Sequence, residues 1–380
     1  MIIGVVKETF PGERRVALVP SILPTFTKAG IEVLIEAGAG ISAGFPDTSF
    51  AEKGAKIVSR QEALSAEVLL QVRSLGANPQ MGHADLGAMR QGLVVIGMCD
   101  PLGMPEESRV LAERGVTHFS LELIPRTTRA QSMDVLSSMA TVAGYRAVLL
   151  AATHLPKMFP MLTTAAGTIT PAKVFIMGAG VAGLQAIASA RRLGAVVSAN
   201  DVRSAVKEQV QSLGAKFVEV PVDQSAEGQG GYAKAMDEEF YRKQRELLSK
   251  TVAESDVVIT TALIPGKPAP KLVTADMVRA MQPGSVIVDL AAERGGNCEL
   301  TRPGETADVG GVTILGPMNL PAEIPYHASQ MFAKNITTFL MNMVKEGQLK
   351  IDTTDEIVRE TLISRAGKVV NERVLAGLKG

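Results

Sequence analysis

The stretch "KVFIMGAGVAGLQAIASARRLGAVVSAND", Lys173–Asp201, decides the fold of this chain. Gly178, Gly180 and Gly183 form the pattern G-x-G-x-x-G between a short apolar run and a helical pattern. The first glycine permits a tight turn, the second lets a pyrophosphate approach the backbone at the helix N-terminus, and the third lets the helix pack closely on the strand. The stretch therefore predicts a strand, a turn and a helix that bind a dinucleotide.

Asp201 ends the next predicted strand, where a carboxylate can accept hydrogen bonds from the adenosine ribose hydroxyls. The same charge would repel a 2′-phosphate, so the sequence favours NAD over NADP. Arg203 weakens this preference because an arginine in that place could meet a phosphate. The alternative interpretation is a structural turn that holds no ligand.

Short β-branched runs alternate with helical patterns almost throughout the chain, which is typical of parallel sheets covered by helices. The first set of predicted strands comprises Ile2–Val6, Glu32–Glu36, Val68–Val72, Leu93–Met98 and Thr117–Glu122. The second set comprises Lys173–Met177, Ala195–Asn200, Lys216–Val220, Asp256–Thr261, Ser285–Leu290 and Val312–Leu315. We therefore expect an α/β protein with two Rossmann-like domains.

Two long helical patterns, at about Thr128–His154 and His327–Lys345, would link the two domains. The expected outer domain comprises residues 1–135 and 330–380, from both chain ends, and the NAD(H)-binding domain residues 136–329. The polar, glycine-rich segment Pro221–Glu246 is too long for a tight connection. It predicts a mobile loop that runs into a surface helix.

Composition excludes several classes of protein. The formal net charge is zero, tryptophan is absent and aromatic residues make up 4%, which argues against a nucleic-acid binder. The two cysteines, Cys99 and Cys298, lie far apart without metal-ligand spacing, so we expect no metal site and a reducing compartment. The N-terminus is no signal peptide, and no run reaches about 18 uninterrupted apolar residues. We therefore expect a soluble chain, which still allows docking to a membrane protein.

A polar cluster, "PRTTRAQSMDVLSS" at Pro125–Ser138, contains arginine, glutamine, aspartate and serine but no histidine, lysine or cysteine. Such residues grip carboxamides, phosphates and ribose hydroxyls rather than transferring protons. The alternative is a helix N-terminus with capping serines and solvated arginines.

Two loops at later strand ends are further candidates, because ligands of open α/β sheets bind at the carboxyl ends of strands. Thr260–Ile264 could form a wall of the nicotinamide site or a proline-stiffened connection. Asp289 and Glu293, with Gly295–Asn297 after them, could supply a catalytic acid, but a hydrogen-bonded loop carboxylate is favoured.

Beyond these patterns, the chain resembles a known family. "GERRVALVP", "RAQSMD", "AGYRAV", "GGYAKAMDEEF" and "TTALIPGKPAP" are similar to the NAD(H)-binding component of proton-translocating nicotinamide nucleotide transhydrogenase. The resemblance covers nearly the whole chain, and a more distant one links it to alanine dehydrogenases. It implies direct hydride transfer from NADH to NADP⁺ on a partner subunit. That step moves no proton, so the site must supply orientation rather than an acid or base.

The resemblance also implies site residues. Arg126, Asp134 and Ser137 would position the NADH nicotinamide, and Gln131 would face the NADP-side nucleotide. Tyr232 would close over the nucleotide, and these five residues would serve the hydride-transfer step. Further NAD(H) contacts would come from Thr127, Thr128, Arg129, Gly178, Gly180, Val181, Gly183, Asp201, Val202, Arg203, Gly231, Gln244 and Leu263.

Alanine dehydrogenases use a lysine and a histidine on their substrate, and both are missing here. The lysine position falls at Gln71 or Arg73, and the histidine position is Asp100. Arg15 remains, but an arginine alone cannot run amino-acid oxidation. A free-standing amino-acid dehydrogenase and a non-enzymatic NAD-sensing module stay as alternatives. The implied partners are membrane-spanning and NADP-binding subunits and a second copy of the chain, with a cytoplasmic location peripheral to the inner membrane.

Overall fold

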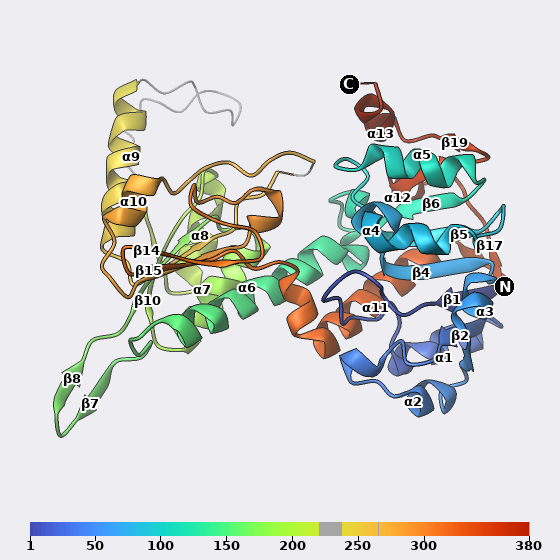
Figure 1. The fold of residues 1–380 in the computed structure, drawn as a ribbon, viewed down its shortest axis with the longest axis horizontal. Coiled ribbons are helices and arrows are strands. Elements are labelled where there is room, and N and C mark those ends of the chain that lie inside the picture. The colour runs from blue at the N-terminus through green and yellow to red at the C-terminus, as the bar shows by residue number, and fades with distance from the viewer. Residues whose placement is uncertain (220–237, 265, 380) are drawn as a thin grey trace. The chain divides into compact units, whose positions relative to one another are not determined.

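The computed structural model describes residues 1–219, 238–264 and 266–379, which form two compact units (Figure 1). Unit 1 combines Met1–Val142 with Pro321–Gly380, and unit 2 comprises Ala143–Leu320. The expected fold class is confirmed, because each unit is built on a mostly parallel sheet and unit 1 takes both chain ends. The boundaries after residues 135 and 329 stay a prediction about independently folding pieces.

Unit 1 holds, in its described part, an eight-stranded sheet with the order β19-β18-β6-β5-β4-β1-β2-β3. The six parallel strands are β1 (Ile2–Val5), β2 (Glu32–Glu36), β3 (Lys56–Val58), β4 (Val68–Arg73), β5 (Val94–Met98) and β6 (Thr117–Ser120). The antiparallel β18 (Leu362–Arg365) and β19 (Lys368–Val369) were not expected, nor was the short β3. The helices are α1 (Leu23–Lys28), α2 (Asp47–Ala51), α3 (Arg60–Leu64), α4 (Pro79–Gly82), α5 (Pro105–Glu113), α11 (Pro325–Asn342), α12 (Glu356–Thr361) and α13 (Glu372–Gly377), and β16 (Val344–Lys345) pairs with β17 (Gln348–Leu349).

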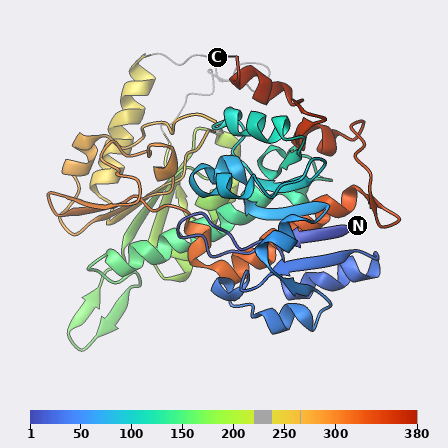
Figure 2. The ribbon, with the colours of Figure 1, turned by 45° about the vertical axis from the view of Figure 1, so that its right-hand side comes forward.

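Unit 2 holds, among its described residues, a seven-stranded sheet with the order β11-β10-β9-β12-β13-β15-β14. The strands are β9 (Lys173–Met177), β10 (Val196–Asn200), β11 (Lys216–Phe217), β12 (Val257–Thr260), β13 (Val286–Asp289), β14 (Thr306–Val309) and β15 (Val312–Leu315). Only β14 runs antiparallel in this described sheet. The helices are α7 (Val181–Arg192), α8 (Lys207–Ser212), α9 (Glu238–Ala253) and α10 (Ala275–Arg279). A separate hairpin, β7 (Leu162–Thr164) with β8 (Gly167–Ile169), extends away from the rest of unit 2 in Figures 1 and 2.

Strand β9 shows why the sequence reads as continuous apolar runs. Val174 and Ile176 pack into the core on one face of the sheet, and Phe175 and Met177 into the core on the other. All four are at most 1% exposed. A parallel sheet covered by helices on both faces buries alternate side chains equally, so the polar–apolar alternation of a half-exposed strand disappears.

The long helix α6 (Val135–His154) begins later than the expected Thr128. Asp134 accepts a hydrogen bond from the Ser137 amide at 2.9 Å, which satisfies a free donor at the helix N-terminus. By length and composition α6 could cross a membrane, but core helices pass the same test. Its first half contributes Val135, Met139 and Val142 to the core of unit 1. Its second half contributes Ala147, Val148 and Ala151 to the core of unit 2.

The second long helix, α11, agrees closely with the expected range but lies wholly within unit 1. The second boundary between the units falls before it, at Leu320 and Pro321. Much of the expected loop at Pro221–Glu246, including Gly231 and Tyr232, lies outside the described residues. The helix expected after that loop is present as α9.

Candidate functional site

The three glycines of the turn between β9 and α7 each meet a different geometric demand. Gly178 has φ +102°, and a Cβ there would lie 2.5 Å from Thr261 Oγ1. A Cβ at Gly183 would lie 1.8 Å from the Gly178 carbonyl oxygen, so only glycine permits this contact. At Gly180 the nearest atom to an added Cβ is Arg203 Nη2, at 3.9 Å. Gly180 thus leaves open space directly before the first turn of α7, where the helix dipole favours an anion.

Asp201 lies at the end of β10 and is tied to this turn. Its carboxylate accepts hydrogen bonds from the Ala179 amide at 2.8 Å and the Arg203 amide at 2.9 Å. The Arg203 guanidinium donates to both carboxylate oxygens at 3.0 Å. Partial burial raises the pKa of Asp201, but the hydrogen bonds from Arg203 and the amides outweigh it, so the pKa lies below its ordinary value. Asp201 is therefore an anionic acceptor that also braces the glycine-rich turn.

Exposed apolar side chains line the same carboxyl edge of the unit 2 sheet. Val181 follows β9, Val202 follows β10, and Leu263 and Ile264 follow β12. Val202 is 90% exposed and Leu263 53% exposed. Flat aromatic rings such as those of a dinucleotide bury well against side chains of this kind. Gln244, on α9, is half-buried.

The next strand end holds a structural carboxylate rather than a catalytic acid. Asp289 is completely buried and accepts hydrogen bonds from the hydroxyls of Thr260 (3.0 Å) and Thr301 (2.7 Å). The amides of Ala291 (3.0 Å) and Cys298 (2.9 Å) also donate to it. Four donors saturate the carboxylate, which supports the hydrogen-bonded loop interpretation. Glu293 accepts a hydrogen bond from the Asn319 amide at 2.6 Å.

The polar cluster of unit 1 divides into tethered and exposed residues. Asp134 caps α6, and the Ser137 hydroxyl donates to it at 2.5 Å. Arg129 forms a bidentate ion pair with Asp355, whose pKa this hydrogen bonding holds well below its usual range. Arg126, Thr127, Thr128 and Gln131 are exposed. Part of the cluster thus behaves as the capping alternative expects, and Arg126 and Gln131 stay available to a ligand.

The carboxyl edge of the unit 1 sheet is filled by its own ionisable groups. Arg15 is 2% exposed, and its guanidinium donates to Glu13 at 2.7 Å and 2.6 Å. Arg73 lies 3.4 Å from Glu13 and stacks over the Phe10 ring. Burial of the Glu8 carboxylate, with repulsion from Glu13, raises the pKa of Glu8 to about 8.

The positions aligned with the alanine dehydrogenase lysine and histidine lie in the same region. Gln71 is buried on β4 beside Arg73. Asp100 adopts φ +45°, and its amide donates to Glu122 at 2.7 Å.

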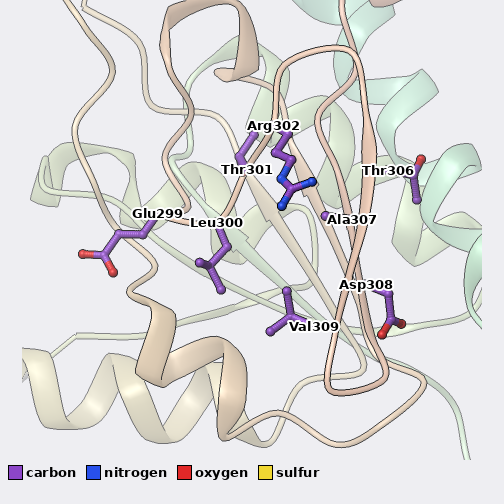
Figure 3. A pocket seen from close by; sticks show the side chains of 8 residues that line it. All are labelled: Glu299, Leu300, Thr301, Arg302, Thr306, Ala307, Asp308 and Val309. Carbon is purple, nitrogen blue, oxygen red and sulfur yellow. The ribbon is translucent and has the colours of Figure 1, made fainter.

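A cavity of about 380 Å³ opens elsewhere in unit 2, along the antiparallel edge strand β14 (Figure 3). Three strands separate β14 from β9 in the sheet, so this cavity does not belong to the glycine-rich turn. Its lining residues are Glu299, Leu300, Thr301, Arg302, Thr306, Ala307, Asp308 and Val309.

The predicted site residues therefore fall into two described groups. Unit 2 brings together the glycine-rich turn, Asp201, Arg203 and the Leu263 loop, and unit 1 carries the polar cluster. Sequence reasoning missed the role of Thr261, whose hydroxyl donates to the Gly178 carbonyl at 3.0 Å. The signal was present, because a hydroxyl residue at a strand end can bond a neighbouring turn, but many threonines share that feature.

Family models match both halves of the chain. The N-terminal domain of alanine dehydrogenase/PNT matches residues 4–143, and the C-terminal domain matches residues 147–372. The chain belongs to the alanine dehydrogenase/PNT family. The resemblance drawn from the sequence is thereby confirmed.

Relatives within the alanine dehydrogenase/PNT family differ in their distance from the chain. An NAD(P) transhydrogenase subunit alpha of Rhodospirillum rubrum is 46% identical over 377 residues, 98% of each chain. That of Rickettsia prowazekii is 42% identical, covering 98% of this chain and 96% of the relative. Alanine dehydrogenase of Bacillus subtilis is 29% identical over 388 residues, covering 100% of this chain and 95% of the relative.

Solved structures in the alanine dehydrogenase/PNT family repeat this order. A transhydrogenase from Sinorhizobium meliloti superposes with a TM-score of 0.88 at 47% identity, covering 97% of this chain and 100% of that one. An L-alanine dehydrogenase gives 0.82 at 28% identity, covering 100% and 99%. The fold is common to both enzymes, and the sequence lies nearer to the transhydrogenases.

Proposed function

We propose that this chain is the NAD(H)-binding subunit of a proton-translocating transhydrogenase, which passes a hydride directly from NADH to NADP⁺ on a partner subunit. The observation that carries the proposal is the open space at Gly180, beside the anionic Asp201, in a chain 46% identical to a transhydrogenase subunit alpha. A dinucleotide fits these residues, because its pyrophosphate needs close backbone approach and its ribose needs an acceptor.

Bound NADH would supply the hydride, and the residues of this chain would hold it in place. The amides at the start of α7 would bind the pyrophosphate, and Asp201 would accept ribose hydroxyls. Arg126, Asp134 and Ser137 would orient the nicotinamide, with Gln131 toward the partner's nucleotide. Tyr232 and Gly231, outside the described residues, would cover the site. Because hydride transfer between two nicotinamide rings moves no proton, this assignment needs no acid or base.

A free-standing amino-acid dehydrogenase is the competing function, and the edge of unit 1 argues against it. Residues 68–76 contain no lysine, and the Arg15 guanidinium is bound to Glu13. Titration of the purified chain with NADH should show saturable binding, whereas NAD with alanine should give no turnover. Turnover of alanine by the chain alone would establish a dehydrogenase. An NAD-sensing module would instead bind NADH and never pass hydride to an NADP-binding partner.

The partners follow from the proposed reaction. Subunit alpha of Haemophilus influenzae is 40% identical, and this chain covers 72% of it. We infer that an NADP-binding subunit and membrane-spanning subunits couple the hydride transfer to proton translocation. The chain would then lie on the cytoplasmic side, peripheral to the inner membrane. Residues 136–329 would form the nucleotide-binding domain, and residues 1–135 with 330–380 the outer domain.

We further propose that the chain forms a homodimer through the hairpin β7–β8. Met158–Pro171 carries no charged residue, and Met158, Met161 and Ile169 are 47%, 62% and 42% exposed. An isolated two-stranded hairpin is marginal in water, so packing against a second copy would stabilise it. Light scattering should show a dimer that Ile169→Asp converts to monomer, with the exposed Val196→Asp as control. A monomeric wild type at micromolar concentration would refute this assignment.

A further inference from the structure

One buried side chain, Asn297, holds both ends of the loop that follows β12. Its Oδ1 accepts a hydrogen bond from the Ala262 amide at 3.0 Å. Its Nδ2 donates to the carbonyl oxygens of Ala262 at 2.9 Å and Pro270 at 2.8 Å. Asn297 is 0% exposed, so water cannot replace these bonds. A single amide group therefore fixes where the Ala262–Pro270 loop leaves the sheet and where it returns.

Asn297 is itself held in position. The Leu272 and Val273 amides donate to its backbone carbonyl at 2.7 Å and 3.1 Å. The next residue, Cys298, donates its amide to the saturated Asp289 carboxylate. The preceding Gly296 has φ +79°, and a Cβ there would lie 2.6 Å from Asp289 Oδ2. The side-chain amide of Asn297 is thus preorganised by the end of β13.

The other side of the loop is registered against the glycine-rich turn. Thr261 donates its amide to the Met177 carbonyl at 2.9 Å and its hydroxyl to the Gly178 carbonyl at 3.0 Å. Directly beyond Ala262, Leu263 and Ile264 project with 53% and 46% of their surface exposed. The base of the loop is fixed on two sides, and its apolar tip is presented at the carboxyl edge of the sheet.

We propose that Asn297 is a positioning residue for hydride transfer, which acts by holding Leu263 against the nicotinamide end of the bound nucleotide. The inference rests on the proposed function and extends it to a residue that touches no ligand. Asparagine suits the place because one group must accept one hydrogen bond and donate two. Aspartate would keep the shape but set a carboxylate against two carbonyl oxygens.

The test compares Asn297→Ala and Asn297→Asp with Asn371→Ala. Asn371 is a matched control because it is also a buried asparagine, donating to the Glu360 carbonyl at 2.9 Å and accepting from the Arg373 and Val374 amides, but in unit 1. NADH affinity should fall on the order of tenfold in both Asn297 variants and stay within about twofold in the control. Equal affinity in Asn297→Ala and wild type would overturn the inference.

A double-mutant cycle separates positioning from general destabilisation. If Asn297 acts through Leu263, Leu263→Ala should weaken NADH binding by itself and add little to Asn297→Ala. Effects that multiply independently would contradict the proposal. In wild-type protein without NADH, hydrogen exchange at the Ala262 amide should be slow, because the loop base is preformed. Fast exchange there would overturn the inference even if the variants failed to fold. If wild-type protein did not bind NADH, the proposed function and this inference would fall together.

Discussion

The two units carry sheets of the same kind, but their carboxyl edges differ in what fills them. In unit 1 the edge is occupied by groups of the chain itself, above all Glu13 against the buried Arg15. In unit 2 the edge is left open at Gly180, beside the exposed Val202 and Leu263. The difference shows that a Rossmann-like topology provides a place for a ligand, and local side chains decide whether the place stays free.

The filled edge should matter for stability and not for nucleotide binding. Glu13→Ala leaves the Arg15 guanidinium buried without its carboxylate, which should reduce the free energy of unfolding by about 3–5 kcal/mol. Glu106→Ala, which breaks an exposed ion pair with Arg109, should cost no more than about 1 kcal/mol. Urea denaturation measures both. A small loss at Glu13, or a large loss of NADH affinity in its folded variant, would break the comparison.

The open edge should depend on two glycines for different reasons. Gly183→Ala places a Cβ 1.8 Å from the Gly178 carbonyl oxygen, so it should destabilise unit 2 by about 1–3 kcal/mol and abolish tight NADH binding. Gly180→Ala has room in the protein and should fold normally, yet bind NADH more weakly. Thermal unfolding with NADH titration distinguishes the two variants. Wild-type affinity in Gly180→Ala would mean that no ligand approaches this backbone.

Asp201 should show a mixed effect, because it serves both the ligand and the turn. Asp201→Ala removes a charged acceptor, and such hydrogen bonds contribute roughly 1.5–3 kcal/mol, or about tenfold to a hundredfold in NADH affinity. It also frees the Ala179 amide, so a modest loss of stability should accompany the weaker binding. Calorimetric titration measures the affinity. An unchanged dissociation constant would contradict the placement of the ribose.

The polar cluster should separate binding from transfer. Arg126→Ala should weaken NADH binding as well as turnover, because this residue is proposed on the NADH side. Gln131→Ala should mainly slow hydride transfer, by about tenfold, since it is proposed to face the other nucleotide. Stopped-flow transfer with an NADP-binding partner, together with NADH titration, compares them. Loss of NADH binding in Gln131→Ala with intact transfer would reverse the assignment.

The filled edge should also give a pH dependence of stability. Between the ordinary carboxyl pKa of 4.5 and the raised pKa of Glu8, about 8, the folded chain holds a proton that the unfolded chain releases. Stability from this group is therefore complete below pH 4.5 and declines as the pH rises toward 8. His118, whose burial lowers its pKa to about 4, acts oppositely between pH 4 and 6.5. The clear window is pH 6.5–8.

Glu8→Gln should flatten the decline in that window, which is less than about 1.4 kcal/mol per pH unit for one group. Urea midpoints at pH 6.5 and 8 for wild type and variant measure it. Equal slopes in the two proteins would show that Glu8 is not the group responsible.

Most of the fold followed from the sequence, because buried parallel strands are continuous apolar runs with helices between them. Strands such as β18 and β19 escaped because their two to four residues gain stability only by pairing beside β6. The glycine-rich turn and Asp201 were predictable from spacing alone. The roles of Thr261 and Asn297 were not, since their partners lie 83 and 35 residues away in the chain. Likewise, nothing in the order of residues showed that Arg129 pairs with Asp355.

Direct hydride transfer is tested most sharply by isotope. NADH carrying deuterium on its reactive face would be mixed with this chain and the NADP-binding partner in ordinary water, and the NADPH analysed by mass spectrometry. The account predicts that the deuterium arrives in NADPH undiluted by solvent protons, because no side chain of the polar cluster can relay a hydride. Deuterium washing out into water would contradict direct transfer between the two rings.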